Sequence, residues 1–469
     1  MNRASRLCFG LALLGAAAAP PAGAATRAVA TVTDYGVSGS AADIQATSPW
    51  TYRGCVANVC SDAVVRFYAG RFYVVNRAGC DNIQVLDPSP AWHTAQQFTV
   101  GAGSNPHDIA FASATKAYVT RYDSADLWIV NPQTGAHTGT LSLAAFADAD
   151  GIPEMDRAAV VGPRLFVTLQ LLDRANFYAP TGPGKVVVID TGADTVIDAD
   201  PATPGRQAVT LTGANPNTTL QFNPADRRLY VGETGNYGVA DGGIEPLDPV
   251  TLQPGGFAVR EDSLRGDVGE FRFTGGGQGY AIVSDASFNT SLVRFDLATH
   301  RRTGTVYAPS GFVLADLAAD DLGQVWVADR TATAPGVRVF DAATGAQETS
   351  SAVALCLPPF GLALDVAVST GVPDAPPRPA ALEVRAPGGA LFRGAAEFSV
   401  RGGSGARRAR LVDVAGRAVR EWTLPPGPAE ARLRWDGRAA GGAAAAPGVY
   451  WLRVESGGEA AAARVVKIG

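Results

Sequence analysis

Residues 117–135 read AYVTRYDSADLWIVNPQTG: a short apolar run, a polar turn, a second apolar run and a tight turn. Both runs are short, alternate in polarity and contain aromatic and β-branched residues, as half-buried strands do. Pro132 and Gly135 in the last turn favour reversal of the chain. The stretch therefore predicts two antiparallel strands joined by a short loop.

Copies of this pattern recur along most of the chain. In each copy an aromatic residue followed by small or β-branched residues marks the first run, and these markers are Tyr73, Tyr118, Phe166, Tyr230, Tyr280 and Trp326. The second run ends in Asp or Asn, at Asp87, Asn131, Asp190, Asp248, Asp296 and Asp341. The markers are 45, 48, 64, 50 and 46 residues apart. Short strands and turns repeating at this period predict four-stranded blades arranged around an axis.

The number of blades follows from the inner strands. Seven candidates are found, beginning at Asp62, Pro106, Pro153, Pro216, Asp267, Phe312 and Phe360. Six of them are followed by a full set of later strands, whereas the seventh is not. Residues 26–61 contain a degenerate version of the three missing strands. We therefore expect the N-terminal segment to close the last blade, which would hide both free sheet edges.

These residues also carry a family resemblance. AYVTRYDSADLWIVNPQTG and LFVTLQ…KVVVIDTGADTVID resemble blades of the YVTN-type bacterial β-propeller family, which is similar in shape to NHL and quinoprotein-type propellers. The resemblance covers about residues 26–368 and implies a seven-bladed β-propeller over residues 25–368. Because the family consists mostly of binding and surface proteins, the resemblance implies binding more than catalysis.

The sequence texture changes after Val368. Residues 369–379 contain Pro373, Pro376, Pro377 and Pro379, which indicates an extended linker. Residues 380–469 show antiparallel strand patterns at 411–417, 433–438, 447–454 and 463–468, which predict an Ig-like β-sandwich. Their order resembles the FlgD-like Ig domain and the C-terminal sorting domain of type IX secretion cargo, whose last strand ends in a Lys-hydrophobic pair, here Lys467-Ile468. The resemblance implies the secretion machinery as a partner. The predicted fold class is thus all-β, a seven-bladed β-propeller with a C-terminal Ig-like β-sandwich.

The N-terminus predicts export. Arg3 and Arg6 precede an apolar stretch, and residues 22–24 offer a small-x-small cleavage site, so residues 1–24 are interpreted as a signal peptide. The apolar stretch is shorter than the roughly 20 residues that a spanning helix needs, and no later stretch is longer, so no transmembrane anchor is expected. We expect a secreted, extracellular or outer-surface protein. The net charge of −5 argues against nucleic acid as a partner.

Cysteine usage fits the same compartment. The expected mature chain contains four cysteines, Cys55, Cys60, Cys80 and Cys356. An even number in an oxidising compartment predicts two disulfides, here near the closing blade. The sequence leaves all three pairings open, and four buried free thiols are the alternative.

Candidate site residues follow from the propeller geometry, because inner strands begin and second strands end at one mouth of the ring. The candidate ligand-binding residues there are Asn105, His107, Asp108, Arg121, Asn217 and Asp285. Calcium takes six to eight oxygen ligands, so the candidate metal ligands are the carboxylates Glu154, Asp156 and Asp267. The competing interpretation is that these side chains cap strands and bond to neighbouring blades.

Two functions remain open. The sequence contains no G-x-S-x-G, H-E-x-x-H, C-x-x-C or nucleotide-binding glycine motif, so an enzyme is less expected than a binding protein. The first function is a secreted or surface propeller that binds a ligand or protein at its mouth and carries a C-terminal sorting or adaptor domain. The alternative is a calcium-assisted hydrolase, by analogy with propeller lactonases.

Overall fold

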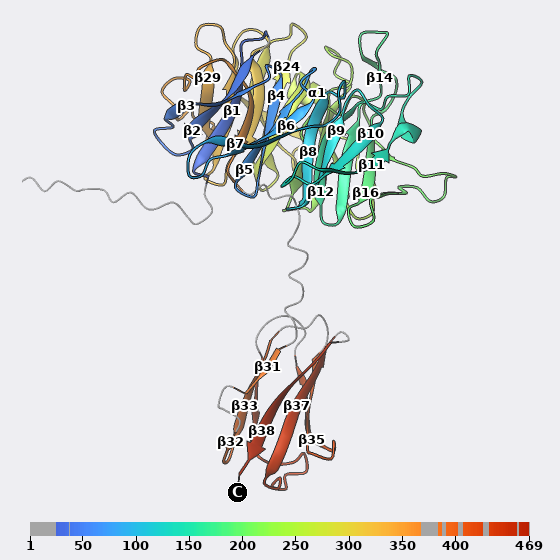
Figure 1. The fold of residues 1–469 in the computed structure, drawn as a ribbon, viewed down its shortest axis with the longest axis vertical. Coiled ribbons are helices and arrows are strands. Elements are labelled where there is room, and N and C mark those ends of the chain that lie inside the picture. Colours follow the sequence, from blue (N-terminus) through green and yellow to red (C-terminus); the bar gives the residue numbers. More distant parts are fainter. Residues whose placement is uncertain are drawn as a thin grey trace, which may run out of the picture. The chain divides into compact units, whose positions relative to one another are not determined.

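The structure is a computed structural model that divides into two compact units, Met1–Gly371 and Val372–Gly469 (Figure 1). It describes residues 25–36, 38–366, 383–386, 391–401, 407–424, 431–456 and 459–468. The signal peptide expected at 1–24 and the linker expected at 369–379 lie outside the described residues. None of the helices in these ranges is long and apolar enough to span a membrane.

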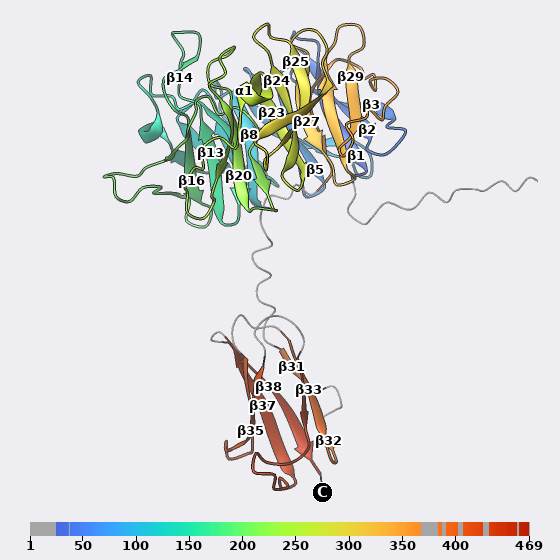
Figure 2. The same ribbon diagram turned by 180° about the vertical axis from the view of Figure 1, so that it is seen from behind.

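The first unit is a β-propeller of seven antiparallel sheets, numbered here as blades 1 to 7 (Figures 1 and 2). Blade 1 contains β4 (Ala63–Tyr68), β5 (Arg71–Asn76), β6 (Asn82–Asp87) and β7 (His93–Thr99). Blade 2 contains β8 (Pro106–Ser113), β9 (Lys116–Arg121), β10 (Asp126–Val130) and β11 (His137–Ser142). Blade 3 contains β12 (Met155–Val161), β13 (Arg164–Leu169), β16 (Lys185–Asp190), β17 (Thr195–Ile197) and β18 (Val209–Thr210). A 3-10 turn, η1 (Ala144–Phe146), precedes blade 3, and a small hairpin, β14 (Leu172–Asp173) and β15 (Ala179–Pro180), interrupts it.

The remaining blades complete the ring. Blade 4 contains β19 (Gln221–Asn223), β20 (Arg228–Glu233), β21 (Gly243–Leu247) and β22 (Val259–Arg260), and blade 5 contains β23 (Asp267–Gly275), β24 (Gln278–Ser284), β25 (Thr290–Asp296) and β26 (Arg301–Tyr307). Blade 6 contains β27 (Leu314–Ala319), β28 (Gln324–Asp329) and β29 (Gly336–Asp341). Blade 7 contains β30 (Pro359–Leu364), β1 (Arg27–Thr33), β2 (Gly39–Gln45) and β3 (Tyr52–Val59). A short helix, α1 (Glu261–Leu264), joins blades 4 and 5.

Blade 7 closes the ring as expected. Its inner strand β30 pairs with β1, with Leu364 opposite Ala28 and Gly361 opposite Thr31. The remaining strands β2 and β3 also come from the N-terminal segment. The prediction that residues before Asp62 complete the seventh blade is therefore confirmed.

The marker aromatics explain why the repeat specifies a propeller. All six are buried in second strands, and each packs in a cluster with residues of the following blade. Trp326 of blade 6, for example, packs with Ala28 and Val32 of blade 7. Its indole N–H donates to Asp320 at 3.0 Å, so the ring is buried without an unpaired polar atom. The repeated aromatic residue thus fills the layer between blades.

Two disulfides hold the closing region, which confirms the prediction from the cysteine count. Cys55 of β3 pairs with Cys356, which precedes β30, and their Cα atoms are 6.5 Å apart. Cys60 pairs with Cys80, with Cα atoms 6.6 Å apart. The first bond joins segments 301 residues apart in the sequence.

The second unit is an Ig-like β-sandwich. One sheet contains β31 (Glu383–Arg385), β33 (Ala396–Arg401) and β36 (Ala431–Trp435). The other contains β32 (Leu391–Phe392), β38 (Glu459–Lys467), β37 (Gly448–Ser456), β34 (Arg407–Val412) and β35 (Ala418–Leu424). Trp435 is fully buried between them and contacts the rings of Phe392 and Tyr450 edge-on.

One face of the propeller carries the predicted site. Because neighbouring strands in a blade are antiparallel, the inner strand begins where the second strand ends. We call this face the mouth face. It also carries the loops that join second to third strands and those that enter each new blade, including the β14–β15 hairpin at the top of Figure 1. By contrast, β30 ends and β1 begins at the opposite face.

Candidate functional site

A β-bulge interrupts the inner strand close to the mouth in several blades. The register shifts between Pro106 and Asp108 in β8, and at equivalent places in β12, β23, β27 and β30. A bulge leaves a residue outside the ladder and re-aims its side chain. The residues left out include His107, Asp156 and Phe360. The bulges therefore bring side chains far apart in sequence to one place.

A polar network joins blades 2 and 3 at the mouth. His107 Nδ1 lies 2.7 Å from Asp156 Oδ1, and Gln170 Nε2 donates to Asp156 Oδ2 at 3.0 Å. The Tyr122 hydroxyl donates to Gln170 Oε1 at 2.9 Å, and the Tyr122 ring stacks on His107 with centroids 4.1 Å apart. Both carboxylate oxygens of Asp156 and the side-chain oxygen of Gln170 are thus bonded to another side chain. Gln170 and Tyr122 lie in the loops that follow the second strands of their blades. The sequence predicted that these strands end at the mouth.

Burial and charge set the protonation of this network. Burial lowers the pKa of His107 below its usual value, so the ring is neutral and its Nδ1–H donates to Asp156. Burial also opposes ionisation of Asp156, but Arg157 at 3.6 Å and the His107 hydrogen bond hold the pKa of Asp156 below its usual value. The pair is therefore a carboxylate facing a neutral imidazole.

Asn105 and Asp108, both candidate ligand residues, bond to neighbouring blades instead. Asp108 accepts from Arg66 Nε at 2.8 Å and from the Ala158 N–H of blade 3 at 3.1 Å. Asn105 Oδ1 accepts from the Ala78 N–H of blade 1 at 2.9 Å. These contacts match the interpretation that polar strand starts bond to neighbouring blades.

The other ligand candidates are dispersed over the mouth face. Asn217 Oδ1 accepts from the Thr234 hydroxyl at 2.8 Å, and Asn217 Nδ2 reaches the Tyr237 hydroxyl at 3.4 Å. Arg121 lies over the Trp128 ring, with its Cζ 4.7 Å from the ring centroid, and donates to backbone carbonyls. Asp285 is exposed and folds its own loop. The structure thus brings His107 and Asp156 together, but not Arg121 or Asp285 with them.

The three candidate metal ligands are held by different donors. Glu154 accepts from Arg174 Nε at 2.7 Å and from the Leu172 N–H at 3.0 Å. Asp267 Oδ2 accepts from the Gly238 N–H at 2.7 Å. In the described parts of the chain, no three His, Cys, Asp or Glu side chains gather as metal ligands would. Glu154, Asp156 and Asp267 are thus bonded to separate sets of N–H and guanidinium donors, and a calcium site formed by them stays a prediction.

Exposed aromatic residues surround the mouth, and sequence analysis did not find them. They lie on loops of the mouth face in blades 3, 4, 5 and 7 and before blade 6, and they are Tyr35, Phe177, Tyr178, Tyr237, Phe288 and Phe312. We call these six residues the aromatic rim; each is at least half exposed, and Phe177 is 97% exposed. Among the large exposed apolar residues described in the propeller, only Val250 lies at the opposite face. The exposed apolar surface is therefore concentrated at the mouth.

The backbone of the rim loops is unusual. Tyr35, Phe177, Tyr178 and Phe288 have φ between 54° and 60°, the left-handed region that residues with a Cβ seldom adopt. An aspartate folds each of these loops through backbone N–H groups; Asp285, for example, accepts from Ser287 and Asn289 at 2.9 Å. Phe177 and Phe288 combine this conformation with an exposed apolar ring, a combination that favours a role in binding over a role in the fold. The signal in sequence was an aromatic residue one to five positions after an aspartate in a turn.

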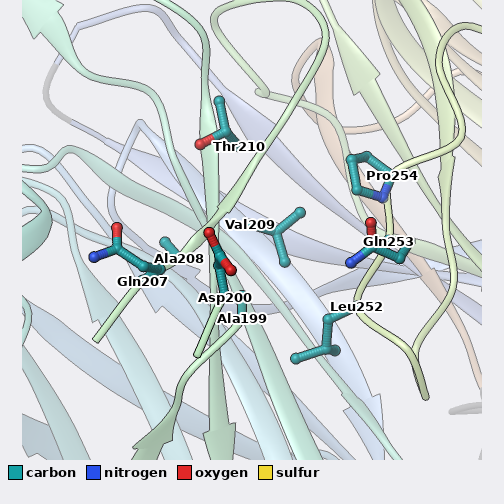
Figure 3. Close-up of a pocket in the computed structure, with 9 residues that line it drawn as sticks. All are labelled: Ala199, Asp200, Gln207, Ala208, Val209, Thr210, Leu252, Gln253 and Pro254. Atoms are coloured by element: carbon teal, nitrogen blue, oxygen red, sulfur yellow. The ribbon is translucent and has the colours of Figure 1, made fainter. Parts of the chain in front are cut away.

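A separate hollow of about 400 Å³ lies between blades 3 and 4 (Figure 3). Its lining comes from the segment around β18 and from the loop containing Leu252 and Gln253. Asp200 is the one titratable side chain among its nine lining residues, and it bonds to Thr203 within its own loop. A single carboxylate with no base or nucleophile beside it offers no catalytic pair, so the mouth remains the candidate site.

Comparisons with known proteins agree with the fold. No protein-family model and no curated protein matches the chain. A solved structure from Lactobacillus plantarum matches with a TM-score of 0.51 and 13% identity, over 72% of this chain and 99% of that one. A candidate 6-phosphogluconolactonase of Bacteroides uniformis matches with a TM-score of 0.50 and 13% identity, over 72% and 98%. At these identities the likeness shows the propeller fold alone.

A third solved structure has a longer chain. PorZ, a surface component of the type IX secretion system of Porphyromonas gingivalis, matches with a TM-score of 0.47 and 14% identity. The match covers 92% of this chain and 63% of PorZ, so this chain spans less than two thirds of that protein.

Proposed function

We propose that this protein is a secreted or surface-attached binding protein that holds a partner protein against the mouth face of its propeller. The aromatic rim carries the proposal. Tyrosine and phenylalanine are enriched at the centres of protein interfaces, where rigid rings contribute contact area at a small entropic penalty. Six such residues lie on one face, whereas Val250 alone is comparably exposed on the other.

The size of the rim favours a macromolecule over a small ligand. Its residues come from four blades and from the loop before a fifth, so they are spread over most of the mouth face, with none in blades 1 and 2. A small molecule seated between His107 and Asn217 would not touch Phe177, which projects from the β14–β15 hairpin and is almost fully exposed. A folded partner lying across the mouth would cover all six rings.

Photo-crosslinking in producing cells tests this function. A benzophenone amino acid placed at Phe177 or Phe288 should give a discrete crosslinked adduct of one size. The matched control places the same group at Val250, which is 70% exposed on the opposite face, and should give no such adduct. Absence of an adduct at every rim position, or the same adduct at Val250, would refute binding at the mouth.

The second unit is proposed as the sorting or adaptor domain. Its last strand β38 ends at Lys467, and Ile468 follows it partly exposed, which supports the resemblance to sorting domains. Deleting residues 380–469 should then change the location of the propeller without unfolding it, as measured by fractionation and thermal denaturation. An unchanged location would argue against sorting.

The alternative function, a calcium-assisted lactonase, needs a cation at the axis. Its candidate ligands Glu154 and Asp156 are engaged by Arg174 and His107, so the geometry favours binding. Calcium should accordingly leave the melting temperature of the mature protein unchanged, and a calcium-dependent rise that Glu154→Gln abolishes would restore the alternative.

A further inference from the structure

Two arginines flank one aromatic ring at the mouth. Arg77 follows β5 of blade 1, and Arg330 follows β28 of blade 6. The intervening blade 7 contributes the bulged residue Phe360. The guanidinium carbons of Arg77 and Arg330 lie 5.6 and 5.5 Å from the centroid of the Phe360 ring. Two positive groups from different blades are thus held beside the same partly buried ring.

Arg330 lacks a counter-charge. It donates through Nε to the Tyr35 hydroxyl, and its Cζ lies 4.0 Å from the Tyr35 ring centroid. Across the described residues, no carboxylate lies within ion-pair distance of it. Burial lowers the pKa of Arg330 below its usual value, with Tyr35 and the more distant Asp62 acting in the opposite direction. Arg330 is thus a partly buried cation that no carboxylate neutralises in the described part of the chain.

Arg77 has an unused donor as well. Its Nη2 binds Asp62 at 2.5 Å, but its Nε is buried and has no hydrogen-bond partner in the described part of the protein. Two other partly buried arginines, by contrast, bind carboxylates: Arg174 binds Glu154 and Asp123, and Arg272 binds Glu270. In the described part of the propeller, Asp62 pairs with Arg77 and no carboxylate pairs with Arg330, which leaves one positive charge and the buried Nε donor of Arg77 unmatched.

From this arrangement we infer that Arg77 and Arg330 form a subsite for an oxyanion, a carboxylate or a tetrahedral phosphate or sulfate group, beside Phe360. The inference rests on the proposed binding function and names the chemistry that the partner presents at the mouth. A planar guanidinium binds oxyanions through two parallel N–H donors, and such charge-assisted bonds are stronger than neutral ones. The anion would supply the charge that Arg330 lacks and an acceptor for the unused donors.

Titration with small anions tests the subsite. Sulfate, phosphate and acetate are added to the mature protein at pH 7, against sodium chloride at equal ionic strength, and dissociation constants are taken from the melting temperature. At least one oxyanion should stabilise the protein more than chloride does. Sulfate or phosphate acting alone would identify a tetrahedral group, and acetate acting alone a carboxylate.

Variants assign the effect to these arginines. Arg330→Gln should weaken binding of the anion at least tenfold. Arg330→Lys, which keeps the charge but loses the pair of parallel N–H donors, should weaken binding less. Arg302→Gln is the control, because Arg302 on the outermost strand β26 is also desolvated without an ion pair, but donates to the Leu264 carbonyl. No oxyanion effect in the wild type, or an equal effect in Arg330→Gln, would overturn the subsite. If crosslinking at Phe177 succeeds while the titration fails, the binding function stands and this inference alone falls.

Discussion

Glu233, Glu245 and Glu261 are fully buried in blade 4 and its connection to blade 5. Glu261 accepts from the N–H groups of Gly242 and Val268, both at 2.8 Å. Glu233 accepts from Gly213 through Oε2, whereas its Oε1 has no hydrogen-bond partner among the described residues. A buried carboxylate oxygen without a donor destabilises a fold, and protonation relieves that penalty by removing the charge.

Burial makes protonation favourable here. It raises the pKa of Glu233 well above its usual value, and the charge of Glu245 raises it further. Burial also raises the pKa of Glu261 to about 8, against the stabilising N–H bonds to its carboxylate. In the unfolded chain both groups titrate near 4.5. The folded state therefore binds more protons than the unfolded state between pH 4.5 and 8, and stability falls as the pH rises through that window.

Glu233→Gln should remove part of the fall in stability that accompanies the rise in pH. A glutamine amide can donate where the protonated carboxyl did, and it does not ionise, so we expect a gain of about 1–3 kcal/mol at pH 8 and little change at pH 5. Denaturant unfolding at the two pH values measures it. The control Asp262→Asn, at a mostly exposed side chain next to Glu261, should have no pH-dependent effect. A loss of stability at pH 8 in Glu233→Gln would show that Glu233 is ionised in the fold.

The loops of the aromatic rim carry exposed aromatic side chains, some of them on strained backbone. Phe288 lies at φ 59° in the loop between β24 and β25 and is half exposed, so its ring is both strained and solvated. Phe312 is also exposed on the mouth face, but it is not among the left-handed residues. Substitutions at Phe288 and Phe312 can therefore be compared to separate the effect of backbone conformation on stability from the effect of ring exposure.

Phe288→Gly should therefore stabilise the fold while weakening partner binding. Glycine adopts the left-handed region without a Cβ clash, a relief of about 1 kcal/mol. Phe312→Gly offers no such relief and should be neutral or destabilising, while also weakening binding. Thermal denaturation combined with crosslinking at Phe177 measures both properties. Equal destabilisation by the two changes would mean that Phe288 contributes to the fold after all.

The elements also show what the sequence could and could not predict. The strand repeat could be predicted from the sequence because Tyr118 and its counterparts must fill the layer between blades, and this requirement recurs in each copy. Bonding of Asp108 to a neighbouring blade was one of the interpretations open from sequence, but its partner was not predictable, because the Ala158 donor belongs to another blade and is brought near only by the packing of blade on blade. Exposure of Phe177 depends on the β14–β15 hairpin, which accounts for part of the irregular 64-residue spacing of the markers.

For the molecule as a whole, the two disulfides differ in the loop that they close. Cys55–Cys356 closes a loop of 301 residues and Cys60–Cys80 a loop of 20. Constraint of the unfolded chain grows slowly with loop length, so the long loop is worth about 5 kcal/mol and the short one about 3 kcal/mol. Replacing Cys55 and Cys356 by serine should thus lower the free energy of unfolding more than replacing Cys60 and Cys80. Equal losses in denaturant unfolding would show that native contacts, not chain constraint, dominate.

Closure by the N-terminal strands makes the ring one cooperative body. Deleting residues 25–61 would remove three of the four strands of blade 7 and leave β30 as a lone strand between blades 6 and 1. It would also expose Trp326, which packs against Ala28 and Val32, and would leave Cys356 without its partner. Since both faces of every blade are covered only while the ring is closed, the truncated chain should lose its cooperative thermal transition and expose apolar surface to a hydrophobic dye. Deleting residues 380–469 instead removes a separate compact unit and should leave that transition intact. A truncation of residues 25–61 that melts like the full chain would mean that six blades suffice for a stable ring, and that the seventh serves only to present Tyr35 and Phe360 at the mouth.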